Sequence, residues 1–282
     1  MTITEGITTR SIDVPGARLH YEVRGGANSA GPLLFVIGSP MGAAEFAALA
    51  DALASDRTVV TYDPRGLAGS TIDDPTQDAT PDLRADDVAA ILDALGAESA
   101  DVFGSSGGAV TGLALVNRHP GRVRTLIAHE PPLLELLSDA EAQRAGTEDI
   151  IETFHREGPD AAFVQFMTTA GYDLSDPKLG PPPGPEPTDE QLAKHMADTA
   201  RFFTHELRDT TRYLPDVAAL LASSTDVLVG IGVDSGHLLT HRTSTALCAL
   251  LGRSPVEFPG DHVGFLGAPE PFADRLREVL AG

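Results

Sequence analysis

The chain has little of the chemistry that supports covalent cross-links or membrane spans. Cys248 is the only cysteine among 282 residues, and tryptophan is absent. A single cysteine excludes an intramolecular disulfide, and its apolar neighbours at 246–251 predict a buried helix face rather than a reactive thiol. No apolar run approaches the roughly 20 residues that a helix needs to cross a bilayer, so no membrane attachment is expected.

Positive charge is also in short supply. Twenty lysines and arginines stand against 41 acidic residues, which gives a formal net charge of −21. Such a chain repels nucleic acid and anionic membrane surfaces, so both are excluded as partners. The first residues, 1–6, lack the basic and apolar regions of a secretory signal, and this predicts a cytoplasmic location. Composition leaves a homodimer open.

The most informative motif is the pentapeptide Gly104-Ser105-Ser106-Gly107-Gly108. It joins a strand-like run at 100–103 to a helix-like run at 109–116. A serine hydroxyl becomes a nucleophile when a sharp turn exposes it between a base and backbone N–H donors. Glycines on both sides let the strand and helix approach closely while the serine takes a strained conformation. The motif predicts that Ser106 is a nucleophile, although a purely conformational turn would also favour glycine and serine.

Apolar strands alternate with helices through much of the chain. A hairpin is expected up to residue 23, because residues 17–23 alternate like a strand after Pro15-Gly16. Fully apolar strands separated by helices imply a parallel sheet covered on both faces. Further strands are predicted at 32–37, 58–62, 100–103, 123–128, 226–232 and 255–258, and helices at about 43–53, 82–95, 109–116, 233–250 and 269–280.

The alternation stops near Glu130. Residues 131–215 contain helical patterns but no convincing buried strand, and they include a Pro/Gly-rich linker at 180–185. The sequence therefore predicts a core domain formed by residues 1–130 and 216–282. Residues 131–215 are expected to form a helical cap inserted into that core.

Four motifs in this order resemble those of the α/β-hydrolase family. They are Ile37-Gly38-Ser39-Pro40, Asp63-Pro64-Arg65-Gly66, the pentapeptide around Ser106, and Gly260-Asp261-His262-Val263-Gly264-Phe265. The resemblance extends over nearly the whole chain outside the variable cap. It implies an α/β fold with a mostly parallel central sheet, helices on both faces and an inserted helical cap. Fold alone does not fix function, so each residue needs a chemical role of its own.

The resemblance implies a catalytic triad built on Ser106. His262 lies in a glycine-flanked loop before the terminal helix and is the expected general base, with His129 as its main competitor. Asp234 is the preferred acid, because it follows a predicted strand and gives the order serine, aspartate, histidine that this fold uses. Glu130 is the alternative acid, because some family members place it after the strand that follows the nucleophile.

The same resemblance implies an oxyanion hole. Gly107 should donate one backbone N–H from the start of a helix, and Ser39 should donate the other. Pro40 has no N–H to give. Ile37 replaces a histidine that is common in the family, and the Ser39 hydroxyl is expected to contact the substrate. Arg65 is expected to hold loops around the site.

We expect a cofactor-independent serine hydrolase that cleaves a small-molecule carboxylic ester or lactone through an acyl-enzyme. The same triad could serve C–C hydrolysis, perhydrolysis, lyase chemistry or rearrangement of a natural product, and a non-catalytic small-molecule binding protein is the remaining alternative. No ligand spacing predicts a metal, and no motif predicts a cofactor. Substrate contacts are expected from apolar side chains, mostly of the cap. They are Met41, Phe163, Phe166, Met167, Tyr172, Phe203 and Tyr213, with Phe202 nearby.

Overall fold

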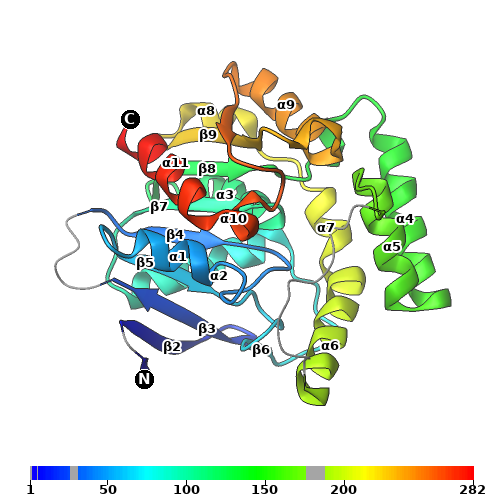
Figure 1. Cartoon of the computed structure of the whole chain (residues 1–282), viewed down its shortest axis with the longest axis horizontal. Helices are drawn as coiled ribbons and strands as arrows, with labels where there is room; N and C mark the ends of the chain where they lie inside the picture. The colour runs from blue at the N-terminus through cyan, green and yellow to red at the C-terminus, as the bar shows by residue number, and fades with distance from the viewer. Residues whose placement is uncertain (1, 5, 26–30, 176–187) are drawn as a thin grey trace.

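The computed structural model describes residues 2–4, 6–25, 31–175 and 188–282 (Figure 1). Within these residues, ten strands form one sheet, in the order β1-β2-β3-β5-β4-β7-β8-β9-β10, with β6 paired to β3 outside this order. The strands are β1 (Thr2–Thr4), β2 (Ile7–Val14), β3 (Ala17–Arg24), β4 (Leu34–Ile37), β5 (Val59–Tyr62), β6 (Thr71–Ile72), β7 (Ala100–Ser105), β8 (Val123–His129), β9 (Asp226–Gly232) and β10 (Val256–Phe258).

Strand direction divides the sheet in two. The β2–β3 hairpin is antiparallel, as its alternating pattern predicts, and β3 also runs antiparallel to β5. In the part of the sheet ordered β5-β4-β7-β8-β9-β10, every pair of neighbouring strands is parallel. Carboxyl ends of parallel strands meet at one edge of a sheet, so the motifs that follow β4, β5, β7, β8, β9 and β10 gather there. The predicted α/β fold with a mostly parallel sheet is confirmed.

Helices cover both faces of the sheet. On one face lie α2 (Pro81–Ala94), α3 (Gly107–Arg118), α8 (Val217–Ala222) and α9 (Leu239–Leu251), and on the other lie α1 (Ala47–Leu53), α10 (Gly264–Gly267) and α11 (Pro269–Ala281). Successive strand residues alternate between these two layers: Phe35 and Ile37 belong to the first cluster, and Leu34 and Val36 to the second. This period of two explains why the strands are apolar throughout.

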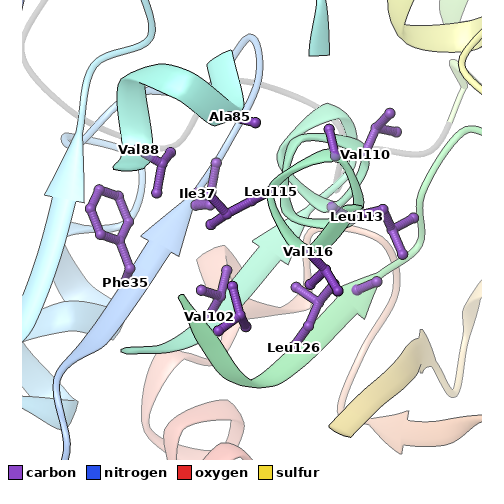
Figure 2. Packing of buried hydrophobic residues seen from close by; sticks show 14 of the residues in the cluster. Phe35, Ile37, Ala85, Val88, Val102, Val110, Leu113, Leu115, Val116 and Leu126 are labelled. Atoms are coloured by element: carbon purple, nitrogen blue, oxygen red, sulfur yellow. The ribbon is translucent and has the colours of Figure 1, made fainter. Parts of the chain in front are cut away.

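Figure 2 shows the first of these apolar clusters. Leu115 of α3 lies beside Ile37 of β4, and Val116 of α3 lies beside Leu126 of β8. Each of these four side chains is buried. Because α3 begins directly after Ser106, this packing fixes the position of the helix that follows the candidate nucleophile.

The remaining helices lie beside the sheet, at the right of Figure 1. They are α4 (Ala140–Glu157), α5 (Pro159–Ala170), α6 (Asp189–His205) and α7 (Leu207–Thr211), preceded by the short helix η1 (Leu134–Leu136). They have an apolar cluster of their own, with Ile150, Ala162 and Phe203 among its members. We call these four helices the cap helices. The division into core and cap domains stays a prediction, and the linker at 180–185 lies outside the described residues.

A few boundaries differ from the predicted ones. The helix expected from about residue 43 begins at Ala47, because the N–H of Ala43 is held by the carboxylate of Asp63 and residues 43–46 form turns instead. The short elements β6, α8 and α10 have too few residues for a periodic pattern. No helix in the described part of the chain is long and apolar enough to cross a membrane. The predicted cytoplasmic location and the homodimer stay predictions.

Candidate active site

Ser106 lies at the sharp turn between β7 and α3. Its φ of 57° and ψ of −124° are strained for a residue with a side chain. The turn needs glycine on both sides, since a Cβ on Gly104 would lie 2.5 Å from the carbonyl oxygen of Gly108, and one on Gly108 would lie 2.0 Å from that of Ile37. The backbone N–H of Ser106 donates to the carbonyl of His129 at 3.0 Å, which ties the turn to β8.

His262 is paired with Glu130. Its Nδ1 lies 2.7 Å from Oε2 of Glu130, whose side chain is fully buried. The same carboxylate accepts hydrogen bonds from the backbone N–H of Gly232 at 2.9 Å and from the hydroxyl of Thr240 at 2.8 Å. With Nδ1–H donated to the glutamate, Nε2 of His262 is left as the basic nitrogen.

The preference for Asp234 as the partner of His262 is wrong. Asp234 is exposed at the start of the short helix η3 (Ser235–His237), where its backbone N–H donates to the carbonyl of Gly260. Glu130 was the alternative acid, and three features bring its carboxylate within reach of His262. It directly follows β8, which lies between β7 and β9; it has a positive φ of 49°; and its side chain crosses to Gly232 at the end of β9.

The electrostatics of Glu130 suit a residue that stabilises a cation. Burial alone would raise the pKa of its carboxyl group, but the hydrogen bond and charge of His262 outweigh burial and lower that pKa to about 2. Glu130 is therefore ionised at neutral pH. An ionised carboxylate in a buried position favours the protonated form of the imidazole that it contacts.

His129, the competing histidine, has a different environment. It is fully buried, with its ring 5.8 Å from Phe103 and 5.7 Å from Phe258. Burial lowers its pKa to about 4, so it is neutral at pH 7. The ring of His129 stacks against that of His262, with 6.3 Å between the ring centroids, and His129 does not line the cavity.

The loop that follows β4 lies against the start of α3, as an oxyanion hole requires. A Cβ on Gly107 would lie 2.8 Å from the carbonyl oxygen of Ser39, so the two segments are in close contact. Neither the N–H of Ser39 nor that of Gly107 has a hydrogen-bond acceptor among the residues that the structure describes. Two free N–H groups next to Ser106 can hold a negatively charged oxygen.

Two residues of the surrounding loops have polar partners within the protein. The hydroxyl of Ser39 donates to the buried carboxylate of Glu206 at 2.9 Å, and its contact with a substrate stays a prediction. Arg65 is buried, and its guanidinium forms a bidentate ion pair with Asp87 on α2. This ion pair anchors the turn after β5 to α2.

A cavity of about 470 Å³ lies between the sheet edge and the cap helices. Ser106 and His262 both line it, together with Ser39 and Gly107. Five of the expected substrate-contacting residues also line it, and so does Phe202. These five are Met41, Phe163, Phe166, Met167 and Tyr172.

Known proteins share the fold of this chain. The family model described as the alpha/beta hydrolase fold matches residues 31–172, half of the chain. The chain belongs to the α/β-hydrolase family. It is 32% identical to the uncharacterized hydrolase YraK of Bacillus subtilis over 99% of this chain and 97% of that protein.

Solved structures of α/β-hydrolases superimpose on nearly the whole chain. An esterase from Thermogutta terrifontis superimposes with a TM-score of 0.72 at 20% identity, over 97% of this chain and 98% of its own. The enol-lactonase from Burkholderia xenovorans superimposes with a TM-score of 0.70 at 18% identity, over 97% and 100%. At this level of identity the likeness shows the shared fold alone.

Two predicted cavity residues of this α/β-hydrolase lie elsewhere. Phe203 is fully buried in the apolar cluster of the cap helices, and Tyr213 packs against the first cluster of the sheet domain. On α6, Phe202 and Phe203 are neighbours that point in different directions, so helical spacing could not assign them without a partner surface.

Several further lining residues belong to no sequence motif that could have identified them. Threonines and apolar residues of the cap helices, together with apolar residues at 132 and 134 before α4, complete the wall. They are Pro132, Leu134, Thr147, Ile150, Leu207, Thr210 and Thr211. In the described part of the chain, no group of three or more histidine, cysteine, aspartate or glutamate residues is arranged to hold a metal ion.

Proposed function

We propose that this protein is a serine hydrolase that cleaves an uncharged carboxylic ester or lactone. Ser106 is the nucleophile, His262 the general base and Glu130 the acid that orients and stabilises the imidazole. One observation carries the proposal: His262, held by the buried carboxylate of Glu130 at 2.7 Å, lines the same cavity as the strained serine Ser106.

The chemistry follows from these positions. Nε2 of His262 takes the hydroxyl proton as Ser106 Oγ attacks the substrate carbonyl, and the N–H groups of Ser39 and Gly107 stabilise the resulting oxyanion. The carbon–oxygen bond to the alkoxide then breaks, His262 gives its proton to that alkoxide, which becomes an alcohol, and the acyl group remains bound to Oγ of Ser106. Water, deprotonated by His262, attacks the acyl-enzyme and releases the acid with Ser106 restored.

The cavity wall supports an uncharged, largely apolar substrate. Its cap side is formed by Phe163, Phe166 and Met167, and its ionisable lining groups beyond the triad include the acidic Glu45 and Asp198. No lysine or arginine lines it among the described residues. Lys194, which does not line the cavity, pairs with Asp198, and His195 also lines the cavity. A substrate anion would therefore meet the carboxylate of Glu45 and no lysine or arginine in the described part of the wall. Two structural neighbours named as a lactonase and an esterase are in keeping with this class.

Substitution of the nucleophile is the direct test. Ser106→Ala should lower kcat on p-nitrophenyl butyrate by several orders of magnitude, because no hydroxyl remains to form the acyl-enzyme. The adjacent serine gives a matched control. Ser105 is fully buried, with its Oγ 3.4 Å from Nδ1 of His129, so Ser105→Ala should retain activity.

Labelling separates this proposal from the alternatives. A fluorophosphonate should modify wild type and Ser105→Ala at Ser106 and should leave Ser106→Ala unmodified. Full activity or labelling of Ser106→Ala would refute the assignment of the nucleophile. Labelling of wild type at Ser106 without turnover of any ester or lactone would refute the hydrolytic reaction and leave the nucleophile in place.

A further inference from the structure

A buried ion pair lies behind the oxyanion loop, outside the catalytic triad. Arg84 of α2 and Glu206, between α6 and α7, are both fully buried, and Nη1 of Arg84 lies 3.3 Å from Oε2 of Glu206. Burial raises the pKa of the Glu206 carboxyl group, and Arg84 opposes that rise. Buried ion pairs give little net stability because both charges lose their hydration, so stability alone does not explain this pair.

Glu206 contacts the first half of the proposed oxyanion hole. The hydroxyl of Ser39 donates to Oε2 of Glu206 at 2.9 Å, the same oxygen that faces Arg84. Ser39 is 3% exposed, and its backbone N–H is one of the two proposed oxyanion donors. The hydrogen bond restricts the side chain of Ser39, and with it the orientation of the residue that carries the N–H.

Arg84 supports the second half through a threonine. Its Nε donates to Oγ1 of Thr111 at 3.1 Å, and the Thr111 hydroxyl in turn donates to the carbonyl of Gly107 at 3.1 Å. Its Nη2 donates to Thr210 of α7 at 2.8 Å. A single guanidinium is thus joined to the cap helices and to the residue that donates the second oxyanion N–H.

We infer that Arg84 and Glu206 are positioning residues that fix Ser39 and Gly107 relative to one another, so that their two N–H groups form one oxyanion hole. Glu206 and Thr210 link that hole to the cap helices. This inference rests on the proposed function, because it concerns the same hole. The pair does not contact substrate. It acts through Ser39 on one side and through Thr111 and Gly107 on the other.

The test compares ground-state and transition-state binding. Glu206→Leu and Thr111→Val should lower kcat by about tenfold to a hundredfold, less than the loss of a donor itself, with KM little changed. A trifluoromethyl ketone forms a tetrahedral oxyanion on Ser106, so its affinity should fall by a similar factor. Affinity for the matching methylene ketone, which remains unreacted, should stay constant. Glu206→Gln keeps an acceptor for Ser39 and should recover part of the loss.

A second buried pair on the same helix is the matched control. Asp87 of α2 pairs with Arg65, and both are about as buried as Arg84 and Glu206. Asp87→Asn should lower Tm while leaving kcat and trifluoromethyl ketone affinity of the folded protein near wild type. If Glu206→Leu does not fold, Thr111→Val and Ser39→Ala decide the matter, since each removes only a hydroxyl from the network.

Equal kcat and equal inhibitor affinity in Thr111→Val, Ser39→Ala and wild type would overturn the positioning role. The role would also be overturned if the network variants changed both KM and kcat and Asp87→Asn changed them in the same way. Failure of the proposed function looks different, because wild type itself would then neither hydrolyse esters nor bind the trifluoromethyl ketone at Ser106.

Discussion

The sheet edge and the cap helices hold their parts of the cavity in different ways. At the sheet edge, backbone hydrogen bonds set the positions: Ser106 N–H donates to His129, and Glu130 N–H donates to Gly230. The cap helices instead depend on a small apolar cluster, and several of their large apolar side chains are exposed, with Phe163 at 49% and Met196 at 52%. The proposed reacting groups therefore lie on a rigid frame, whereas the cap side of the cavity has fewer fixed contacts.

The largest expected effect distinguishes the two candidate acids at the rigid edge. Glu130→Gln should lower kcat by about 10³–10⁴, because an amide cannot stabilise the imidazolium of His262. Asp234→Asn should leave kcat within twofold of wild type, since Asp234 is exposed and away from Nδ1 of His262. Steady-state kinetics on one ester measures both, and a larger loss in Asp234→Asn would restore the aspartate as the acid.

A second test concerns neighbouring faces of the cap. Phe203→Ala should lower the free energy of unfolding by about 3–5 kcal/mol, because Phe203 is fully buried. Phe163→Ala should change stability by about 0.5 kcal/mol or less, given its half-exposed side chain, and should raise KM for the longer acyl esters. Denaturant titration and an ester chain-length series measure these quantities. Equal stability losses would mean that the cavity wall is as tightly packed as the apolar cluster of the cap helices.

Two glycine substitutions compare the frame and the cap directly. Gly108→Ala should cost about 2–3 kcal/mol, since its Cβ would lie 2.0 Å from the carbonyl oxygen of Ile37. Gly146→Ala in α4 should be neutral or stabilising by about 0.5–1 kcal/mol, because a Cβ there meets no atom within 4 Å and alanine favours helix. Thermal unfolding of both variants gives the contrast, and a tolerated alanine at 108 would contradict the tight turn.

The smallest expected effect is a dependence of stability on pH. His129 has a pKa lowered from 6.5 to about 4, so the unfolded chain binds the proton first and stability falls as pH drops from 6.5 toward 4. Glu130, with a pKa lowered from 4.5 to about 2, adds a further loss as pH falls from 4.5 toward 2. His129→Phe should flatten the first slope in urea titrations at pH 7, 6 and 5. An unchanged slope would show that His129 does not cause it.

Patterns within single segments predicted the parallel sheet, the turn at Ser106 and the loop at His262. Apolar periodicity and glycine spacing are local properties, and the structure places the corresponding strands and turns within a few residues of the predicted bounds. The choice between Asp234 and Glu130 was not local. It depends on how far a side chain reaches across β9, which no spacing along the chain reports.

The cap shows the same limit. Phe202 and Phe203 have equal apolar character in the sequence, yet the first lines the cavity and the second is in the cap cluster. Arg84 and Glu206 lie 122 positions apart, and neither belongs to a motif, so the network behind Ser39 could not be anticipated. Long-range pairs of this kind become visible only when separate helices are packed together.

By itself, the sequence determined which segments become strands and helices, because side-chain periodicity decides which face is buried, and it determined where glycine permits a strained serine. Tertiary structure decided which carboxylate meets His262, which aromatic side chains face the cavity, and which buried charges support the oxyanion loop. These depend on distances of a few ångströms between segments far apart in the chain, and such distances are set by the packing of the whole fold.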